Sequence, residues 1–129
     1  MERRRILIVD DREDNANALG SLLRLHGYEV FIETDPLVAL SVAAEKRPDA
    51  VLLDLGLPRL SGYDVCRCIR AEPWGKEMLI IAITGWTRES DRAEARAAGF
   101  DHYLVKPAEL ETVETLLKGE DRRAPRPPK

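Results

Sequence analysis

Residues 6–11 read Ile-Leu-Ile-Val-Asp-Asp. Four apolar residues that end directly in two acids are typical of a short buried β-strand whose carboxyl end reaches the surface. Residues 50–54, Ala-Val-Leu-Leu-Asp, and residues 79–84, Leu-Ile-Ile-Ala-Ile-Thr, repeat this pattern. Strands that are apolar on both sides occur in parallel sheets covered by helices. The repetition therefore predicts an α/β fold.

Weaker runs at residues 29–32 and 103–105 complete a set of five expected strands. Segments with helical spacing of apolar residues lie between and after them. The positions that follow one face of each helix are Leu19, Leu22, Leu23 and His26, then Leu37, Leu40 and Ala44, then Val65 and Ile69, then the alanines of residues 89–98, and finally Leu110, Val113 and Leu117, in a helix starting near Pro107. Caps are expected at Gly27, Asp35 with Pro36, Ser61 and Gly99. Right-handed crossovers then give a (βα)5 doubly wound, five-stranded parallel sheet of flavodoxin-like type.

Composition limits the class of protein. The chain has 129 residues, 44% of them hydrophobic and 33% charged, as expected for one globular domain. The longest apolar run, residues 78–83, is far short of the roughly 20 residues that a membrane span needs. We therefore expect no membrane segment and a cytoplasmic location. Cys66 and Cys68 point to different sides of a helix and are expected to be reduced thiols.

The ends of the chain differ from its body. Basic residues concentrate in residues 1–5 and 119–129, so the body is acidic and no direct contact with nucleic acid is expected. Prolines among charges at the carboxyl end predict a disordered basic tail at residues 119–129, after a domain at residues 1–118.

The polar residues at the strand ends predict a site. In an open parallel sheet the carboxyl ends of the strands form the ligand-binding edge, which brings together Asp10, Asp11, Asp54, Thr84 and Lys106. Three carboxylates at close range repel one another unless a cation lies between them. Mg²⁺, which prefers oxygen ligands, and the ammonium of Lys106 are the two candidates. The acidic loop at residues 10–14 would repel a nucleotide or flavin phosphate, so a phosphoryl group arriving with Mg²⁺ fits better.

Four motifs together resemble the receiver domains of two-component response regulators. They are ILIVDD at residues 6–11, LLDLGLP at 52–58, AITGW at 82–86 and HYLVKP at 102–107, and the resemblance extends over residues 5–118. It implies that Asp54 is the phospho-acceptor and that Asp10 and Asp11 are the acidic metal pair. It also implies a magnesium ligand in the backbone carbonyl of Gly56.

The same resemblance implies switch roles for Thr84 and Tyr103, a phosphate-facing Lys106, and a cis peptide bond between Lys106 and Pro107. The phosphoryl donor would be a phosphohistidine on a histidine kinase or histidine phosphotransfer protein. The domain would catalyse its own phosphorylation and dephosphorylation and would not be a metabolic enzyme. The motifs ITGW and GFDHYLVKP most resemble those of receivers in hybrid histidine kinases. This resemblance implies that the chain is an intermediate of a phosphorelay.

Two other classes stay open at this point. A small phosphohydrolase of the haloacid dehalogenase type also combines acids, Thr and Lys at strand ends, but it needs a second Asp where this chain has Arg12. A constitutive interaction module would not need all five polar residues. The helix at residues 89–98, whose apolar residues are all alanines, is a candidate moving part. We expect Trp86 to lie beside the site, where it either docks a partner or packs within the loop. We expect Trp74 to pack in a turn.

Overall fold

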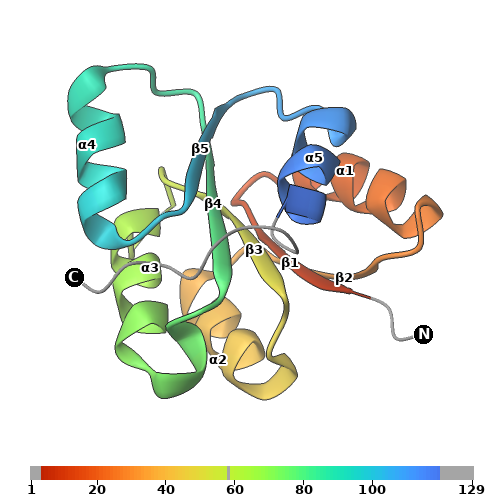
Figure 1. Ribbon diagram of the computed structural model, residues 1–129, viewed down its shortest axis with the longest axis horizontal. Coiled ribbons are helices and arrows are strands. Elements are labelled where there is room, and N and C mark those ends of the chain that lie inside the picture. Colours follow the sequence, from red (N-terminus) through yellow and green to blue (C-terminus); the bar gives the residue numbers. More distant parts are fainter. Residues whose placement is uncertain (1–3, 58, 120–129) are drawn as a thin grey trace.

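The computed structural model describes residues 4–57 and 59–119. Five parallel strands form one sheet in the order β2-β1-β3-β4-β5 (Figure 1). Their bounds are β1 Arg5–Val9, β2 Glu29–Glu33, β3 Ala50–Asp54, β4 Leu79–Thr84 and β5 His102–Val105. This is the flavodoxin-like (βα)5 arrangement that the sequence predicts.

The three solidly apolar strands occupy the centre of the sheet. Every residue of β3 and β4 is buried, and so is β1 after its first residue. The edge strands β2 and β5 are mostly half-buried, because each has only one neighbouring strand and its outer edge reaches solvent. The register pairs Leu53 with Val9 on one side and with Ala82 on the other, so the strands end close together.

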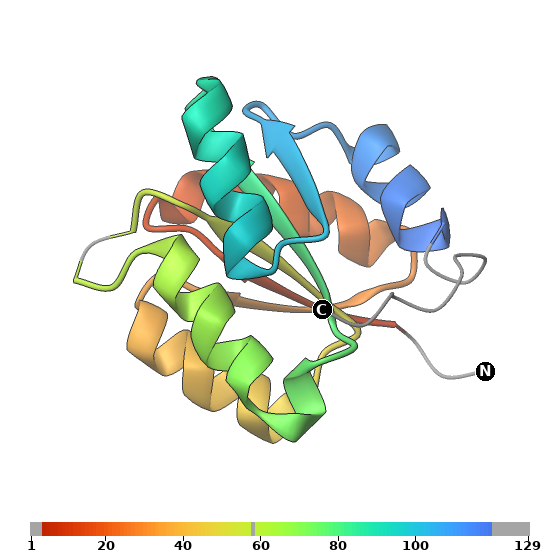
Figure 2. The same ribbon diagram turned by 60° about the vertical axis from the view of Figure 1, so that its left-hand side comes forward.

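Helices cover both faces of the sheet (Figures 1 and 2). α1 Glu13–Leu25 and α5 Leu110–Gly119 pack on one face through residues such as Leu23 and Val113. α2 Pro36–Lys46, α3 Gly62–Ala71 and α4 Glu89–Ala98 pack on the other. A single 3₁₀ turn, η1 Pro73–Gly75, follows α3.

The expected caps are present at both ends of the helices. The side chain of Asp35 accepts a hydrogen bond from the Leu37 N–H at 2.8 Å, and Ser61 accepts one from Asp64 at 3.2 Å. Gly99 ends α4 with φ of +112°, a conformation in which a side chain would be strained. Local sequence signals therefore set these helix boundaries.

Three helix details differ from the sequence analysis. In α2 the buried residues are Pro36, Ala39 and Ala43, whereas Leu37 is 54% exposed, so the expected inner face was wrong. In α1, Leu22 is 44% exposed. α5 begins at Leu110 and not near Pro107. In the first two cases an apolar residue lies beside the buried stripe, where periodicity alone does not distinguish it from a core residue.

An arginine network that the sequence analysis missed lies at the amino-terminal end of the strands. The guanidinium of Arg70 donates hydrogen bonds to the carbonyls of Gly75, Met78 and Gly99, and it pairs with Asp101 at 2.9 Å. The Asp101 carboxylate also accepts a hydrogen bond from the N–H of Ile80. The network joins the end of α3 to the start of β4 and the end of α4, at the edge of the sheet opposite the polar strand ends.

The remaining predictions concern the chain ends and the thiols. Gly119 is the last residue of α5, and residues 120–129 of the expected tail lie outside the described residues. Within the described residues no helix has the length and apolar character needed to cross a bilayer. Cys66 is buried and its thiol donates to the Ala98 carbonyl, Cys68 is exposed, and within the described residues neither forms a disulfide.

Candidate phosphorylation and metal site

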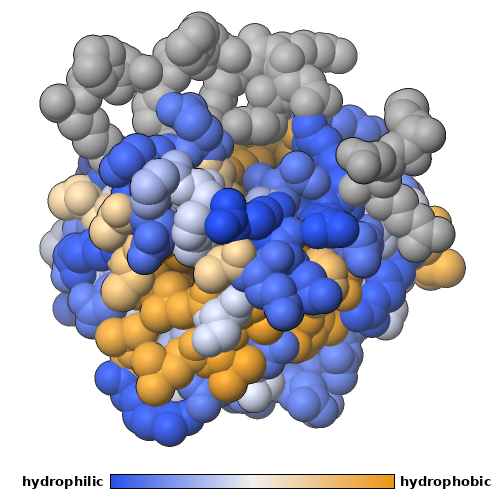
Figure 3. Space-filling model, turned by 90° about the horizontal axis from the view of Figure 1, so that it is seen from below, coloured by the Kyte–Doolittle hydropathy of each residue, from blue (hydrophilic) through white to orange (hydrophobic). Residues whose placement is uncertain are grey.

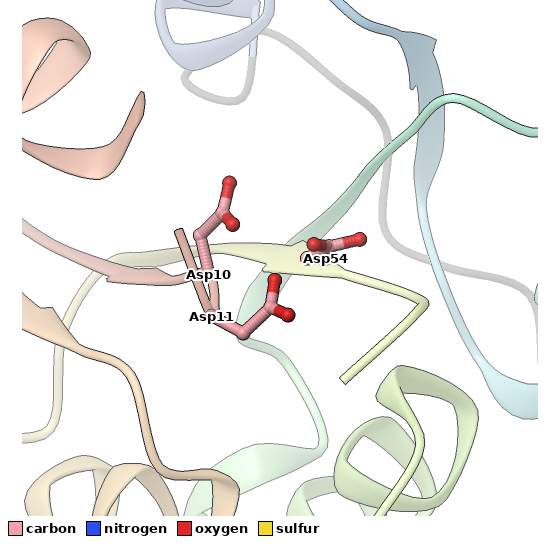
Figure 4. Close-up of side chains that lie close together, drawn as sticks. All are labelled: Asp10, Asp11 and Asp54. Atoms are coloured by element: carbon pink, nitrogen blue, oxygen red, sulfur yellow. The ribbon is translucent and has the colours of Figure 1, made fainter. Parts of the chain in front are cut away.

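The carboxyl ends of the strands bring together every residue that the sequence placed there. Asp10 follows β1, Asp54 and Thr84 are the last residues of β3 and β4, and Lys106 follows β5. Figure 4 shows the carboxylates of Asp10, Asp11 and Asp54 pointing into the same space. Parallel strands that end level with one another therefore assemble a site from distant parts of the chain.

The three aspartates form one cluster. Each offers a carboxylate oxygen, and these oxygens lie within 4.8 Å of one another. Asp10 and Asp54 are buried and Asp11 is exposed, so the cluster is open on one side. Carboxylate oxygens at this spacing suit a hard divalent cation that keeps some of its waters. The residues present thus fit a Mg²⁺ ion.

Lys106 brings a positive charge into contact with the carboxylates. Its Nζ lies 3.2 Å from Asp54 Oδ2 and 3.3 Å from Asp10 Oδ2. Partial burial works to lower the pKa of Lys106, but the two carboxylates outweigh it and hold the pKa above its ordinary value of 10.5. The sequence analysis expected the Lys106 ammonium among the three carboxylates, and it bridges two of them, Asp10 and Asp54. The peptide bond between Lys106 and Pro107 is cis, as the resemblance implied.

Asp54 is held at both of its oxygens. Oδ1 accepts a hydrogen bond from the N–H of Gly56 at 3.1 Å, and Oδ2 faces Lys106. Burial raises the pKa of Asp54 above its ordinary value of 3.8, and the Gly56 hydrogen bond and the Lys106 charge oppose that rise only in part. Asp54 is therefore a fixed carboxylate that is more basic than a solvated one.

A polar cleft of about 380 Å³ opens above Asp54. Its walls include Asp11, Arg12, Gly56, Thr84, Trp86 and Lys106. The cleft has room for a small tetrahedral anion, with carboxylates on one wall and a hydroxyl and an ammonium on others. Arg12, at the position that argued against a phosphohydrolase, forms part of its wall.

Thr84 and Tyr103 are joined through the backbone of Trp86. The buried Thr84 hydroxyl accepts a hydrogen bond from the Trp86 N–H at 3.1 Å, and the Tyr103 hydroxyl donates to the Trp86 carbonyl at 2.8 Å. Arg92 of α4 lies over the Tyr103 ring, 4.7 Å from its centre. A movement of Thr84 therefore reaches α4 and β5 through a short chain of contacts.

The Trp86 ring covers the side of the cleft formed by Gly56. A Cβ atom added at Gly56 would lie 3.4 Å from Trp86 Cζ2 and 4.0 Å from Asp54 Oδ1. The ring centre is also 6.4 Å from that of Tyr63 in α3, although Trp86 remains 42% exposed. The sequence placed Trp86 near the site but did not predict its contact with Tyr63. Trp74 packs against the core beneath Arg47, as expected.

A doubly wound sheet with an acidic cluster, a threonine and a lysine at its strand ends defines a class of phosphoryl-accepting signalling domains. Comparison with known proteins agrees: residues 6–118 match the model of the response regulator receiver domain. This chain belongs to that family, and the haloacid dehalogenase alternative is set aside.

Similar proteins include regulators and kinases. Response regulator MprA of Mycobacterium sp. (strain KMS) is 39% identical over 119 residues, which cover 92% of this chain and 51% of MprA. A putative response regulator from Chloroflexus aurantiacus superposes with a TM-score of 0.87 at 32% identity, over 95% of this chain and 100% of that one. The chain spans about half the length of the curated relatives it matches.

A second similar structure carries a metal. It is the receiver domain of sensor histidine kinase PA1611 from Pseudomonas aeruginosa, described with a magnesium ion coordinated in its active site cleft. It is 35% identical to this chain, with a TM-score of 0.83 over 91% of this chain and 96% of that one.

Proposed function

We propose that Asp54 accepts a phosphoryl group from a phosphohistidine on a histidine kinase or histidine phosphotransfer protein. The phosphorus–nitrogen bond of the donor breaks and a phosphorus–oxygen bond to Asp54 forms. The departing imidazole keeps the electron pair of the broken bond and takes a proton from solvent. The observation that supports this best is the cluster of three carboxylates, within 4.8 Å, that Lys106 bridges at Asp54 and Asp10.

The residues around Asp54 prepare it for this transfer. The Gly56 N–H and Lys106 fix the orientation of the carboxylate, so little motion is needed before attack. Lys106 and the Thr84 hydroxyl can neutralise charge on the phosphoryl oxygens. Asp10, Asp11 and Asp54, with the Gly56 carbonyl, would hold Mg²⁺. When bound, the ion would supply positive charge to the transferred group.

A second cavity offers a path for the donor. It has a volume of about 410 Å³ and lies between α1 and the loop after β5, with Leu19, Leu22, Pro107 and Ala108 in its walls. Asp54 and Lys106 also reach this cavity. The partly exposed Leu22 lies at this place, and the nearby Leu25 of α1 is 82% exposed. We propose that an apolar donor helix docks here and presents its histidine to Asp54.

Phosphorylation would be read out at the surface formed by α4, β5 and α5. When Thr84 turns to the phosphoryl group, the Trp86 N–H loses its acceptor and the loop after β4 is free to shift. α4 buries only Asp91, Ala95 and Ala98, so it resists such a shift less than a leucine-rich helix would. Tyr103, bonded to the same loop, would follow.

The pathway is a finer proposal. The similarity to the PA1611 receiver supports a phosphorelay intermediate of the hybrid kinase type, whereas the similarity to MprA supports a conventional response regulator. The motifs ITGW and GFDHYLVKP favour the phosphorelay intermediate. We also propose that the receiver domain ends near residue 118 and that the protein is cytoplasmic.

A labelling experiment tests the acceptor. The protein is incubated with acetyl phosphate and Mg²⁺, and its intact mass is measured. We expect one added phosphoryl group in wild type and in the control Asp14→Asn, which changes an exposed aspartate of α1, and none in Asp54→Asn. Chelation of the metal should prevent labelling. Equal labelling of wild type and Asp54→Asn, or full labelling with chelator, would overturn the assignment.

A further inference from the structure

The outward side of α2 is unusually apolar for a surface helix. α2 begins Pro-Leu-Val-Ala-Leu-Ser-Val-Ala-Ala, so apolar residues surround it on all sides. Such a helix is usually buried. Here Leu37 is 54% and Val38 44% exposed, and Phe31, Leu40 and Val42 are only partly covered. Figure 3, which views the molecule from the side where α2 lies in Figure 1, shows hydrophobic residues gathered on this face with hydrophilic residues around them.

This surface plays no part in the site proposed above. It lies on the sheet face opposite α1, and the donor cavity has no α2 residue in its walls. It is also separate from α4, β5 and α5 (Figure 1). The exposed apolar residues of α2 therefore need an explanation of their own.

The exposed residues of α2 are complementary in size to a second copy of themselves. At 100° per residue, the outward side consists of Leu37, Val38, Ser41, Ala44 and Glu45, all exposed, with Ser41 at its centre. The two large apolar residues precede Ser41 by one turn, and the small Ala44 follows it by one turn. Two such helices packed antiparallel, with the two-fold axis at Ser41, place Val38 of each copy against the small Ala44 of the other, and Leu37 against the aliphatic stem of Glu45.

The charges agree with the same arrangement. Arg59 lies at the start of α2, where it forms an ion pair with the capping residue Asp35 and stays exposed. Glu45 lies near the end of α2 and is also exposed. Lys46 and Arg47, which follow Glu45, lie over the rings of Phe31 and Trp74, so Glu45 is the charged residue of this end on the outward side. Antiparallel packing brings Glu45 of each copy toward Arg59 of the other, whereas parallel packing would bring Glu45 next to Glu45. Charge complementarity of this kind fixes register more than it adds affinity.

We propose that α2 is a self-association surface through which two copies of this chain pair antiparallel. One pair of helices about 16 Å long buries less than the roughly 800 Å² per partner of a standard interface. The dimer is therefore weak, with a Kd on the order of 0.1 mM, and forms where the local concentration is high. The interface consists of an apolar part, Leu37 and Val38, and a charged rim, Glu45 and Arg59.

Sedimentation equilibrium of the full chain tests the proposal over concentrations from about 10 µM to 1 mM, a span that brackets the expected Kd. Wild type should rise from the monomer mass of 14.5 kDa toward twice that value. Val38→Lys, which introduces a charge and a better helix former, should raise Kd at least about tenfold. Leu25→Lys, which changes the more exposed leucine of α1, should leave Kd unchanged. Circular dichroism melts confirm that the variants fold.

A charge exchange tests the orientation. Glu45→Arg should weaken association, and Glu45→Arg combined with Arg59→Glu should restore it, because the pair across the axis is rebuilt. The proposal is overturned if wild type stays monomeric throughout, if Leu25→Lys weakens association as much as Val38→Lys, or if the double variant is no better than Glu45→Arg. Association that is lost in Arg92→Glu but kept in Val38→Lys would place the interface on α4 and would equally overturn it.

Discussion

Replacing Asp11 by asparagine removes one charge from the acidic cluster. Two carboxylates at 4.8 Å repel one another by about 0.9 kcal/mol in a water-like dielectric, which is appropriate because Asp11 is exposed. Asp11 faces two such neighbours, and Lys106, which bridges those neighbours, offsets part of the repulsion. In the unfolded chain Asp54 is far from Asp11. Without metal we therefore expect Asp11→Asn to raise the free energy of unfolding by up to about 1 kcal/mol.

Magnesium should reverse this order. A ligand at ten times its dissociation constant stabilises the folded protein by about 1.4 kcal/mol, and Asp11→Asn should lose most of that gain because it lacks one ligand. Thermal melts in chelator and in Mg²⁺ measure both effects, which should be shifts of up to about 4 °C for the charge removal and about 5 °C for magnesium binding in a chain of this length.

The matched control is Glu77→Gln, which removes the same charge at the opposite end of β4. It should gain as much from Mg²⁺ as wild type does. A sodium chloride series at equal ionic strength separates coordination from screening. Strong destabilisation of Asp11→Asn in chelator, or an undiminished gain from Mg²⁺, would refute the cluster as a metal site.

Three further predictions concern the lysine, the core and the tryptophans. Because its pKa is raised in the folded protein, Lys106 contributes stability that is complete below pH 10.5 and is lost as the pH rises through the folded-state pKa. The difference in free energy of unfolding between wild type and Lys106→Met, measured by urea titration, should therefore shrink above pH 10.5. Leu53→Ala, at a fully buried position, should cost about 3 kcal/mol in the same assay, and Leu25→Ala less than about 0.5 kcal/mol. Beryllium fluoride with Mg²⁺ should change the fluorescence of Trp86 and not that of Trp74; a change that survives Trp86→Phe would contradict the position of the loop.

The strands and the strand-end site could be predicted because short-range signals determine them. The central strands are apolar on both sides, as only a covered parallel strand can be, and Asp35 and Ser61 cap their helices through bonds to residues two or three positions away. Once the sheet order was assumed, the positions of Asp54 and Thr84 followed, because parallel strands end at a common edge.

The features that sequence analysis missed depend on contacts between distant residues. Arg70 and Asp101 are 31 positions apart, and a basic residue in the last turn of a helix usually faces solvent. The inner face of α2 was misassigned because its apolar residues surround the helix and give no preferred direction. The position of the Trp86 ring beside the site of a Cβ at Gly56 depends on a loop conformation that no periodic pattern describes.

The link between Thr84 and Tyr103 consists of main-chain atoms of residue 86. Nineteen of the twenty genetically encoded residues carry the same N–H and carbonyl groups, so evolution can exchange the tryptophan for a side chain of any size without breaking the link. Proline alone lacks the N–H. The shape of the cleft mouth and the connection between Thr84 and Tyr103 can thus be selected independently, although one codon specifies both.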